Sequence, residues 1–361
     1  MCQKMKKYTR ILAALVLPIL LFFSSGTPTH ASYERSPSLD TRVSSRLWEL
    51  IFGDAIDASE SEELRLIPGG DIFGVRISEG KVTVSEDNAA VGVRQGDIIR
   101  KVEGQKVSTV SEVREIVEAD EDGIITLSLS GSAGECDLKI NTGEERRLGI
   151  SIRDGAAGIG TVTYIDPNNH SFGGLGHGIC EPDTKRVIEI SSGVVSGVIL
   201  GGIEKGEKGH PGELRGILTN KREGEISKNT SVGVFGRLEG RKTDAASALP
   251  IGKASEVHAG AAKIISTVKN GRKAEYSVEI FEVDKTQTGS KCFKVKVTDP
   301  TLLALTGGIV KGMSGSPIIQ DGKLVGAVTH VLVGDPTVGY GIFIENMLNA
   351  SNARNELPKA A

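Results

Sequence analysis

The chain has 361 residues, of which 39% are apolar and 25% charged, and its formal net charge is −3. This balance is typical of a folded globular protein, and the length allows two domains. The small negative charge and the lack of a basic stripe argue against a nucleic-acid partner. Glycine is abundant, at 46 residues, and aromatic residues make up only 4%. Such a composition favours a mainly β protein with many turns.

The N-terminal 31 residues have the pattern of an export segment. Lys4, Lys7 and Arg10 precede an apolar run over residues 11–23, and Ala31 offers a small residue for cleavage. The run is shorter than the roughly 20 residues that span a bilayer. Residues 1–31 are therefore either a cleaved signal peptide or an N-terminal membrane anchor. Residues 32–63 are mostly polar and are interpreted as a linker or stalk.

Residues 64–130 combine short strands with one amphipathic helix. Thr109 and Glu112 have the spacing of a capping box, which predicts a helix start. One apolar face follows it, formed by Val110, Val113, Ile116 and Val117. The turn Gly96-Asp97-Ile98-Ile99 leads into a strand before this helix.

This order of elements resembles a PDZ domain. Such domains bind an extended peptide as an added strand at a sheet edge. The resemblance implies a ligand that is a peptide C-terminus or an internal strand, in a groove lined by the helix from Thr109. It also implies a loop whose N–H groups receive the peptide carboxylate, formed by Ile72, Phe73, Gly74 and Val75.

Residues 131–145 are interpreted as a second linker, 146–350 as a further domain and 351–361 as a tail. The further domain consists almost entirely of short apolar runs and glycine turns, which predicts a barrel or sandwich pair. Strands are predicted over 161–165, 187–190, 194–200, 233–238, 261–268, 275–283, 294–297, 318–319, 324–329 and 340–344. Short helices are predicted only near 301–305 and 345–349.

The run Gly312-Met313-Ser314-Gly315-Ser316-Pro317 has the pattern of a serine-nucleophile turn. Glycines on both sides allow a tight backbone, so the N–H groups of Gly312 and Ser314 can point at one substrate oxygen. The alternative is an ordinary Gly/Ser hairpin loop without chemistry. A serine nucleophile also needs a general base, and the base needs an orienting partner.

His177 is the favoured base, because glycines on both sides leave its imidazole free to face a cleft. His330 is the rival, since it follows the strand beyond the serine. Asp299 is the favoured orienting acid, although an Asp-Pro pair before Thr301 equally fits a helix N-cap. The other candidate carboxylates are Asp166, Asp183 and Asp335.

Several phrases together resemble the SpoIVB peptidase family of endospore-forming bacteria. They are Leu-Gly-His at 175–177, Pro-Gly-Glu at 211–213, Thr-Asp-Pro at 298–300 and the long run over 306–320. The resemblance implies a chymotrypsin-like double β-barrel that acts as a serine endopeptidase. It assigns the catalytic roles to His177, Asp299 and Ser314, the oxyanion hole to Gly312 and Ser314, and implies no metal or other cofactor.

The same resemblance implies a place in sporulation. The enzyme would be exported from the forespore into the intermembrane space, with residues 11–23 as an anchor unless they are cleaved. There it would cleave itself within residues 32–63 and cleave a SpoIVFA-like membrane regulator, which allows pro-sigma-K to be processed. The alternative is a non-catalytic PDZ scaffold at the forespore membrane. Disulfides among Cys136, Cys180 and Cys292, or three free thiols, are both consistent with the sequence.

Overall fold

The computed structural model describes residues 63–132, 134–240, 243–268 and 271–352. The expected export segment over residues 1–31 lies outside these ranges, as do nearly all of the expected stalk and tail. Within the described ranges, no helix is long and apolar enough to cross a membrane. The three cysteines of the described part, Cys136, Cys180 and Cys292, are free thiols.

Six antiparallel strands form the first barrel. They pair in the order β7-β8-β11-β10-β9-β2, and the additional pairing of β2 with β7 closes the ring. Its interior is filled by large apolar side chains such as Phe73, Val162 and Phe172. The strands are β2 (Ile72–Val84), β7 (Ile152–Ile165), β8 (Ser171–Gly174), β9 (Ser192–Glu204), β10 (Glu213–Thr230) and β11 (Gly233–Leu238).

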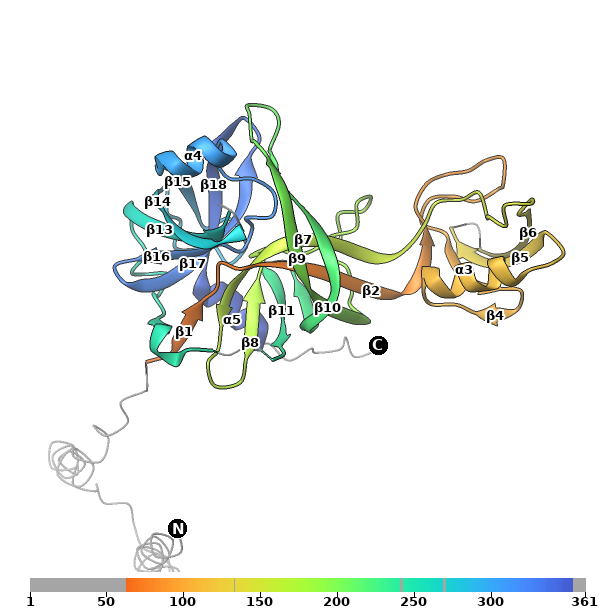
Figure 1. Cartoon of the computed structure of the whole chain (residues 1–361), viewed down its shortest axis with the longest axis horizontal. Helices are drawn as coiled ribbons and strands as arrows, with labels where there is room; N and C mark the ends of the chain where they lie inside the picture. The colour runs from red at the N-terminus through yellow and green to blue at the C-terminus, as the bar shows by residue number, and fades with distance from the viewer. Residues whose placement is uncertain (1–62, 133, 241–242, 269–270, 353–361) are drawn as a thin grey trace, which may run out of the picture. The chain divides into compact units, whose positions relative to one another are not determined.

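A second six-stranded barrel follows in the chain and closes in the order β13-β14-β15-β18-β17-β16 (Figure 1). In β14, inward residues Tyr276, Val278 and Ile280 alternate with exposed ones, as a strand with one buried face requires. The strands are β13 (Gly260–Thr267), β14 (Lys273–Phe281), β15 (Phe293–Val297), β16 (Pro317–Gln320), β17 (Lys323–Leu332) and β18 (Asp335–Phe343). The expected mainly β, double-barrel architecture is therefore confirmed.

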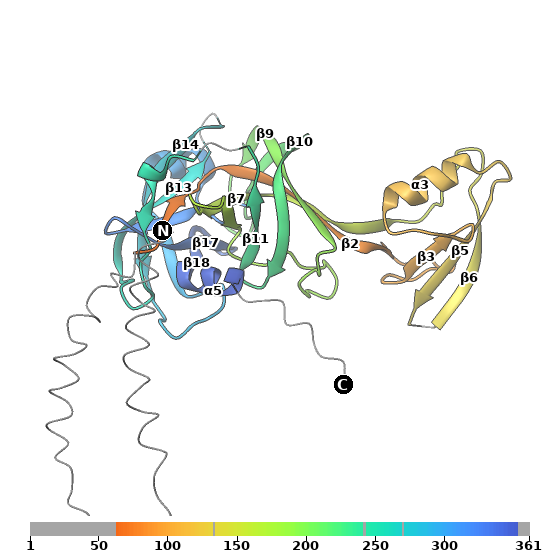
Figure 2. The same ribbon diagram turned by 90° about the horizontal axis from the view of Figure 1, so that it is seen from below.

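Short elements complete the two barrels. Strand β1 (Arg65–Pro68) pairs with β7 and with β12 (Leu249–Pro250), which follows the 3₁₀ turn η1 (Ala245–Ser247). In the chain, helix α4 (Pro300–Thr306) follows β15 and precedes β16. Helix α5 (Ile344–Asn352) packs next to β17 and β18 (Figure 2). Both helices confirm those predicted near residues 301 and 345.

A small module with its own apolar core is inserted between β2 and β7. Its helix α3 (Val110–Ala119) begins at the predicted capping box, and Val113 and Val117 are buried. The other elements are β3 (Ile98–Val102), β4 (Gln105–Lys106), β5 (Ile124–Gly131) and β6 (Gly134–Asn141). The ends of the two long barrel strands lead into it, since Val84 pairs with Ile152.

Two predicted domain boundaries were wrong. Residues 67–78 belong to the first barrel, because Ile67, Phe73 and Ile77 pack into that core and not into the module. The predicted linker over 131–145 contains β6, which pairs with β5 from Gly134 to Asn141. The module is therefore an insertion within the first barrel and not a domain that precedes it.

Separate cores predict separate unfolding. Leu127→Ala should destabilise the module by about 2–5 kcal/mol, because Leu127 is fully buried in the module core and the change leaves a cavity. Hydrogen exchange should then accelerate in β5 and β6 and stay slow in β13–β18. Leu324→Ala, in the core of the second barrel, is the matched control and should show the opposite pattern. Uniform acceleration in both variants would contradict separate cores.

Candidate active site

The serine turn links the chain after Lys311 to β16. Gly312 and Gly315 both have φ near +96°, a left-handed conformation that glycine adopts without strain. A Cβ on Gly315 would lie 2.0 Å from the carbonyl oxygen of Thr161, so no other residue fits there. The glycines of the motif are thus required by the backbone and by its close approach to β7.

Strand β7 of the first barrel holds this turn of the second. The Thr161 N–H donates to the Ser314 carbonyl at 2.9 Å, and the Thr161 hydroxyl donates to the Gly312 carbonyl at 2.8 Å. The Thr163 hydroxyl donates to the Gly315 carbonyl at 2.8 Å. Both threonines are fully buried. Three bonds from one strand therefore hold the backbone before and after Ser314.

The N–H groups of Gly312 and Ser314 are available for a substrate oxygen. The Lys311 carbonyl accepts from Leu214, and the Met313 carbonyl accepts from Ser316, each at 2.9 Å. In a planar trans peptide the N–H points away from the carbonyl oxygen, so these bonds turn both N–H groups the other way. Neither N–H has an acceptor among the described residues, which is what an oxyanion hole requires.

His177 and Ser314 line the same cavity, of about 330 Å³. His177 lies just after β8. Between them, Leu175 and Gly176 have φ of +66° and +68° and turn the chain sharply. Its Nδ1 lies 2.9 Å from the Gly178 carbonyl oxygen, so Nδ1 carries the proton and Nε2 is the basic nitrogen. Burial lowers the pKa of His177, more than the Gly178 contact raises it. A lowered pKa keeps the ring neutral at neutral pH, as a general base must be.

The second predicted base lies beside the first. The His330 ring centroid is 4.8 Å from that of His177, and the ring planes are tilted by 39°. The Ser314 hydroxyl donates to the carbonyl oxygen of Thr329 at 2.7 Å, and Thr329 is the residue before His330. The tertiary structure therefore brings together Ser314 and both histidines that the sequence left in competition.

The structure does not bring Asp299 to this cluster. Its carboxylate caps α4, accepting at 2.9 Å from the N–H groups of Thr301 and Leu302. It forms no hydrogen bond or ion pair with His177, whose Nδ1 already contacts Gly178. The N-cap alternative is thus what the structure contains. The other carboxylates bond elsewhere: Asp166 with Asn168, Asp183 with Arg153 and Asp335 with Thr337.

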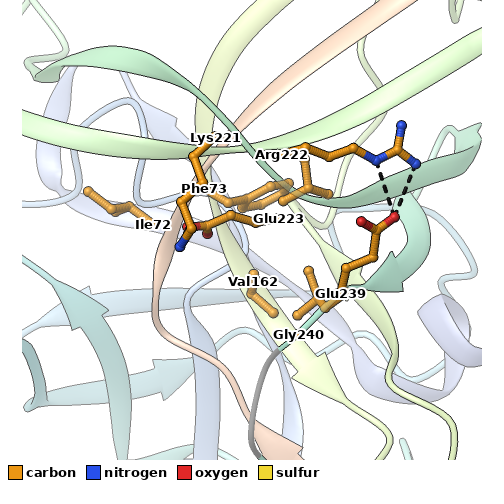
Figure 3. Close-up of a pocket in the computed structure, with 10 residues that line it drawn as sticks. Ile72, Phe73, Val162, Lys221, Arg222, Glu223, Glu239 and Gly240 are labelled. Atoms are coloured by element: carbon orange, nitrogen blue, oxygen red, sulfur yellow. Dashed lines mark hydrogen bonds and ion pairs between the residues drawn. The ribbon is translucent and has the colours of Figure 1, made fainter.

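The predicted carboxylate-binding loop was also wrong. Ile72, Phe73, Gly74 and Val75 lie in β2, and Gly74 pairs with Ile159 on one side and Ser196 on the other. A strand paired on both edges has no N–H groups free for a peptide. Ile72 and Phe73 do line a cavity of about 380 Å³ (Figure 3). Its other residues include Val162 and the ion pair of Arg222 with Glu239, at 3.1 Å, and it holds neither nucleophile nor base.

The module has a larger groove, of about 670 Å³, between α3 and residues 145–152. Residues 147–151 are not in a strand, although they lead into β7. Val110, Val113 and Val117 line the helical side. Arg146 and Arg147 are exposed beside it, and Arg114 is the third arginine of the lining. The sequence signal for this site was an apolar-Gly-apolar run, Leu148-Gly149-Ile150, after two arginines.

A double barrel with a serine turn, free N–H groups and an imidazole in one cavity defines a serine peptidase. The family comparison agrees: the model of the SpoIVB peptidase S55 family matches residues 144–348. The chain belongs to this family and is a serine peptidase. No curated protein matches the chain.

The comparison with solved structures finds distant matches. The Rv3671c protease from M. tuberculosis in its active form has 12% identity and a TM-score of 0.33, covering 56% of this chain and 77% of that one. The HtrA-type protease AlgW with a tripeptide has 12% identity and a TM-score of 0.31, covering 54% of each chain. The assignment to the family rests on the family model.

The threonine contacts predict a selective loss of catalysis. Thr161→Val removes the hydroxyl that holds the Gly312 carbonyl, so kcat should fall by about 10-fold to 100-fold as the oxyanion N–H groups lose alignment. Thr267→Val is the matched control, because the Thr267 hydroxyl donates to the Gly70 carbonyl at the same 2.8 Å away from the site. Both variants should lose about 1–3 kcal/mol of stability. Equal kcat values in the two would show that Thr161 has no catalytic effect.

The cap role of Asp299 predicts different results for two substitutions. Asp299→Asn should keep both stability and kcat near wild type, because asparagine caps helices as well as aspartate does. Asp299→Ala should lose about 0.5–2 kcal/mol in denaturant unfolding. If Asp299 orients His177 during turnover, Asp299→Asn would instead lower kcat by about 10⁴-fold, as loss of a triad carboxylate does.

Proposed function

We propose that this serine peptidase is an exported endopeptidase of sporulation. Its substrates are its own N-terminal segment, within residues 32–63, and a membrane regulator of the SpoIVFA type, whose cleavage allows pro-sigma-K to be processed. The family membership supports the sporulation role. The basic and apolar pattern over residues 1–23 supports export from the forespore into the intermembrane space, with association to the membrane.

The observation that carries the catalytic part is the serine turn facing His177 in one cavity. Nε2 of His177 takes the proton of the Ser314 hydroxyl as the oxygen attacks the peptide carbonyl. The N–H groups of Gly312 and Ser314 stabilise the negative charge that develops on the carbonyl oxygen. The protonated His177 then donates to the leaving amine, and water releases the acyl group by the reverse sequence.

For this chemistry the Ser314 hydroxyl has to turn from the Thr329 carbonyl to His177. Such a rotation is small, since a serine hydroxyl moves between staggered rotamers about one bond. Catalytic hydrogen bonds are often long or absent without substrate and form in the complex. The observed contact is therefore compatible with Ser314 as the nucleophile.

We further propose that the module between β2 and β7 captures the C-terminus of a peptide in the groove beside α3. Val113 and Val117 offer an apolar wall for its last side chain. The non-strand segment 147–151 offers an edge for an added strand. Arg146, which donates to the Glu118 carbonyl, and Arg147, which pairs with Glu145 at 3.4 Å, offer positive charge for a terminal carboxylate. This groove takes the place of the loop that the sequence predicted at residues 72–75.

The test of the proposed function compares two serines of the same motif. Ser314→Ala should abolish both self-cleavage and cleavage of the purified regulator, as followed by intact mass over time, because it removes the nucleophile. Ser316→Ala is the matched control: its hydroxyl is buried and contacts the Ser266 hydroxyl at 3.2 Å, so activity should persist. Truncation of the Ser314→Ala chain at the wild-type rate would refute the assignment. An intact wild-type chain and regulator would favour the scaffold function.

A further inference from the structure

A bulge in β17 places His330 in the active site. Val328 pairs with Gly341 and Val331 pairs with Gly339, so β17 contains one more residue than β18 between these two pairs. The extra residue falls at Thr329 and His330. Bulges of this kind re-aim side chains and often lie next to active sites.

The bulge gives the two residues different tasks. The Thr329 side chain is buried, and its hydroxyl donates at 2.8 Å to the Ser290 carbonyl, while its own carbonyl accepts from Ser314. The next side chain, His330, faces the His177 ring at a centroid distance of 4.8 Å. The Nδ1 atom of His330 is buried and has no hydrogen-bond partner among the described residues. Such a buried, unpaired polar atom is costly and uncommon in folded proteins.

No carboxylate supports either imidazole. In the described part of the chain, neither ring has an acidic hydrogen-bond or ion-pair partner, and no cluster of three His, Cys, Asp or Glu side chains with metal-site spacing occurs. The contacts that restrict the His177 ring are the Gly178 carbonyl at Nδ1 and the ring of His330. A general-base histidine needs a neighbouring group that holds its ring, because an unrestrained imidazole loses its alignment with the nucleophile.

We propose that His330 is the positioning residue of this active site, and that its ring holds the catalytic imidazole of His177 in line with Ser314 in place of a carboxylate. The inference rests on the proposed roles of Ser314 and His177. His330 does not touch the substrate; it acts through the ring beside it. The site is then a serine with two adjacent histidines in tilted ring contact, of which one transfers protons and the other stays neutral.

Electrostatics are consistent with a neutral partner. Burial, the neighbouring His177 and the Lys291 ammonium lower the pKa of His330 from 6.5 to about 4. Lys291, the only one of these with a permanent charge, also lies over the Tyr340 ring at 5.0 Å. Lys311 and Cys180 also line the cavity. A neutral His330 avoids repelling the imidazolium that His177 becomes during turnover.

The experiment measures how fast a fluorophosphonate labels Ser314 in the full-length chain, as a function of pH. Labelling forms an O–P bond at Ser314 and releases fluoride, with His177 taking the proton, so it needs the base and no natural substrate. His330→Ala should slow it by about 10-fold to 100-fold. It should also move the acid limb of the curve of labelling rate against pH to higher pH. Water replaces the lost ring, so the burial that lowers the pKa of His177 is relieved.

Two further variants separate positioning from folding. His330→Phe keeps a neutral ring of similar shape and should recover most of the rate, with the acid limb at the wild-type pH. His258→Ala is the matched control, since His258 is exposed and pairs with Asp321 at 2.9 Å outside the site. It should behave as wild type. If His330→Ala unfolds, the labelling rate and acid limb of His330→Phe still test whether the ring positions His177.

The outcomes that overturn the inference are distinct. A wild-type rate and acid limb in His330→Ala show that the ring positions nothing. Complete loss in both His330 variants, with labelling retained in His177→Ala, makes His330 the base. A loss in His330→Phe as large as in His330→Ala, with unmoved acid limbs, indicates a merely structural role. Absence of labelling in the wild type would sink the proposed function itself, whatever the variants do.

Discussion

The active site depends on the hydrogen bonds that β7 donates to the serine turn. Thr161 and Thr163 bind the carbonyls of Gly312, Ser314 and Gly315 from a different barrel. The Gly312 and Gly315 carbonyls are buried, and leaving them unpaired would cost about 1–3 kcal/mol each. The bonds therefore hold the barrels in register where the nucleophile lies. They also hold the backbone around Ser314, while the bonds from Leu214 and Ser316 orient the two free N–H groups.

Strand β7 has a second consequence for the molecule. Its first residue, Ile152, lines the groove beside α3, and residues 157–159 line the cavity of Ser314. The same strand then supplies Thr161 to the serine turn. A continuous, hydrogen-bonded strand thus runs from the small module to the nucleophile. Insertion of the module between β2 and β7 is what makes this continuity possible, because a module at the chain end would share one strand at most.

The two histidines illustrate why chemistry needs tertiary contacts to be assigned. The sequence offered His177 and His330 as rival bases and Asp299 as the acid. Folding pairs the two rings at 4.8 Å and leaves the acid at the start of α4. Asp299 had the spacing of both a triad member and an N-cap, and short-range pattern cannot separate these roles. Only the position of the strand ends relative to one another decides which group reaches an imidazole.

Local pattern was sufficient for features whose cause is local. The glycines of the serine turn, the capping box of α3 and the alternating strands of the second barrel follow from backbone sterics and one-sided burial. The predicted strand at 187–190 and the missed strand β10 (Glu213–Thr230) show the limit. Strand β10 has many charged residues and bulges, so only its partners identify it. The sequence by itself determined the glycine-dependent serine turn and the mainly β class. The tertiary structure alone decided the insertion of the module, the site of its groove and the pairing of His177 with His330, because each depends on contacts between residues far apart in the chain.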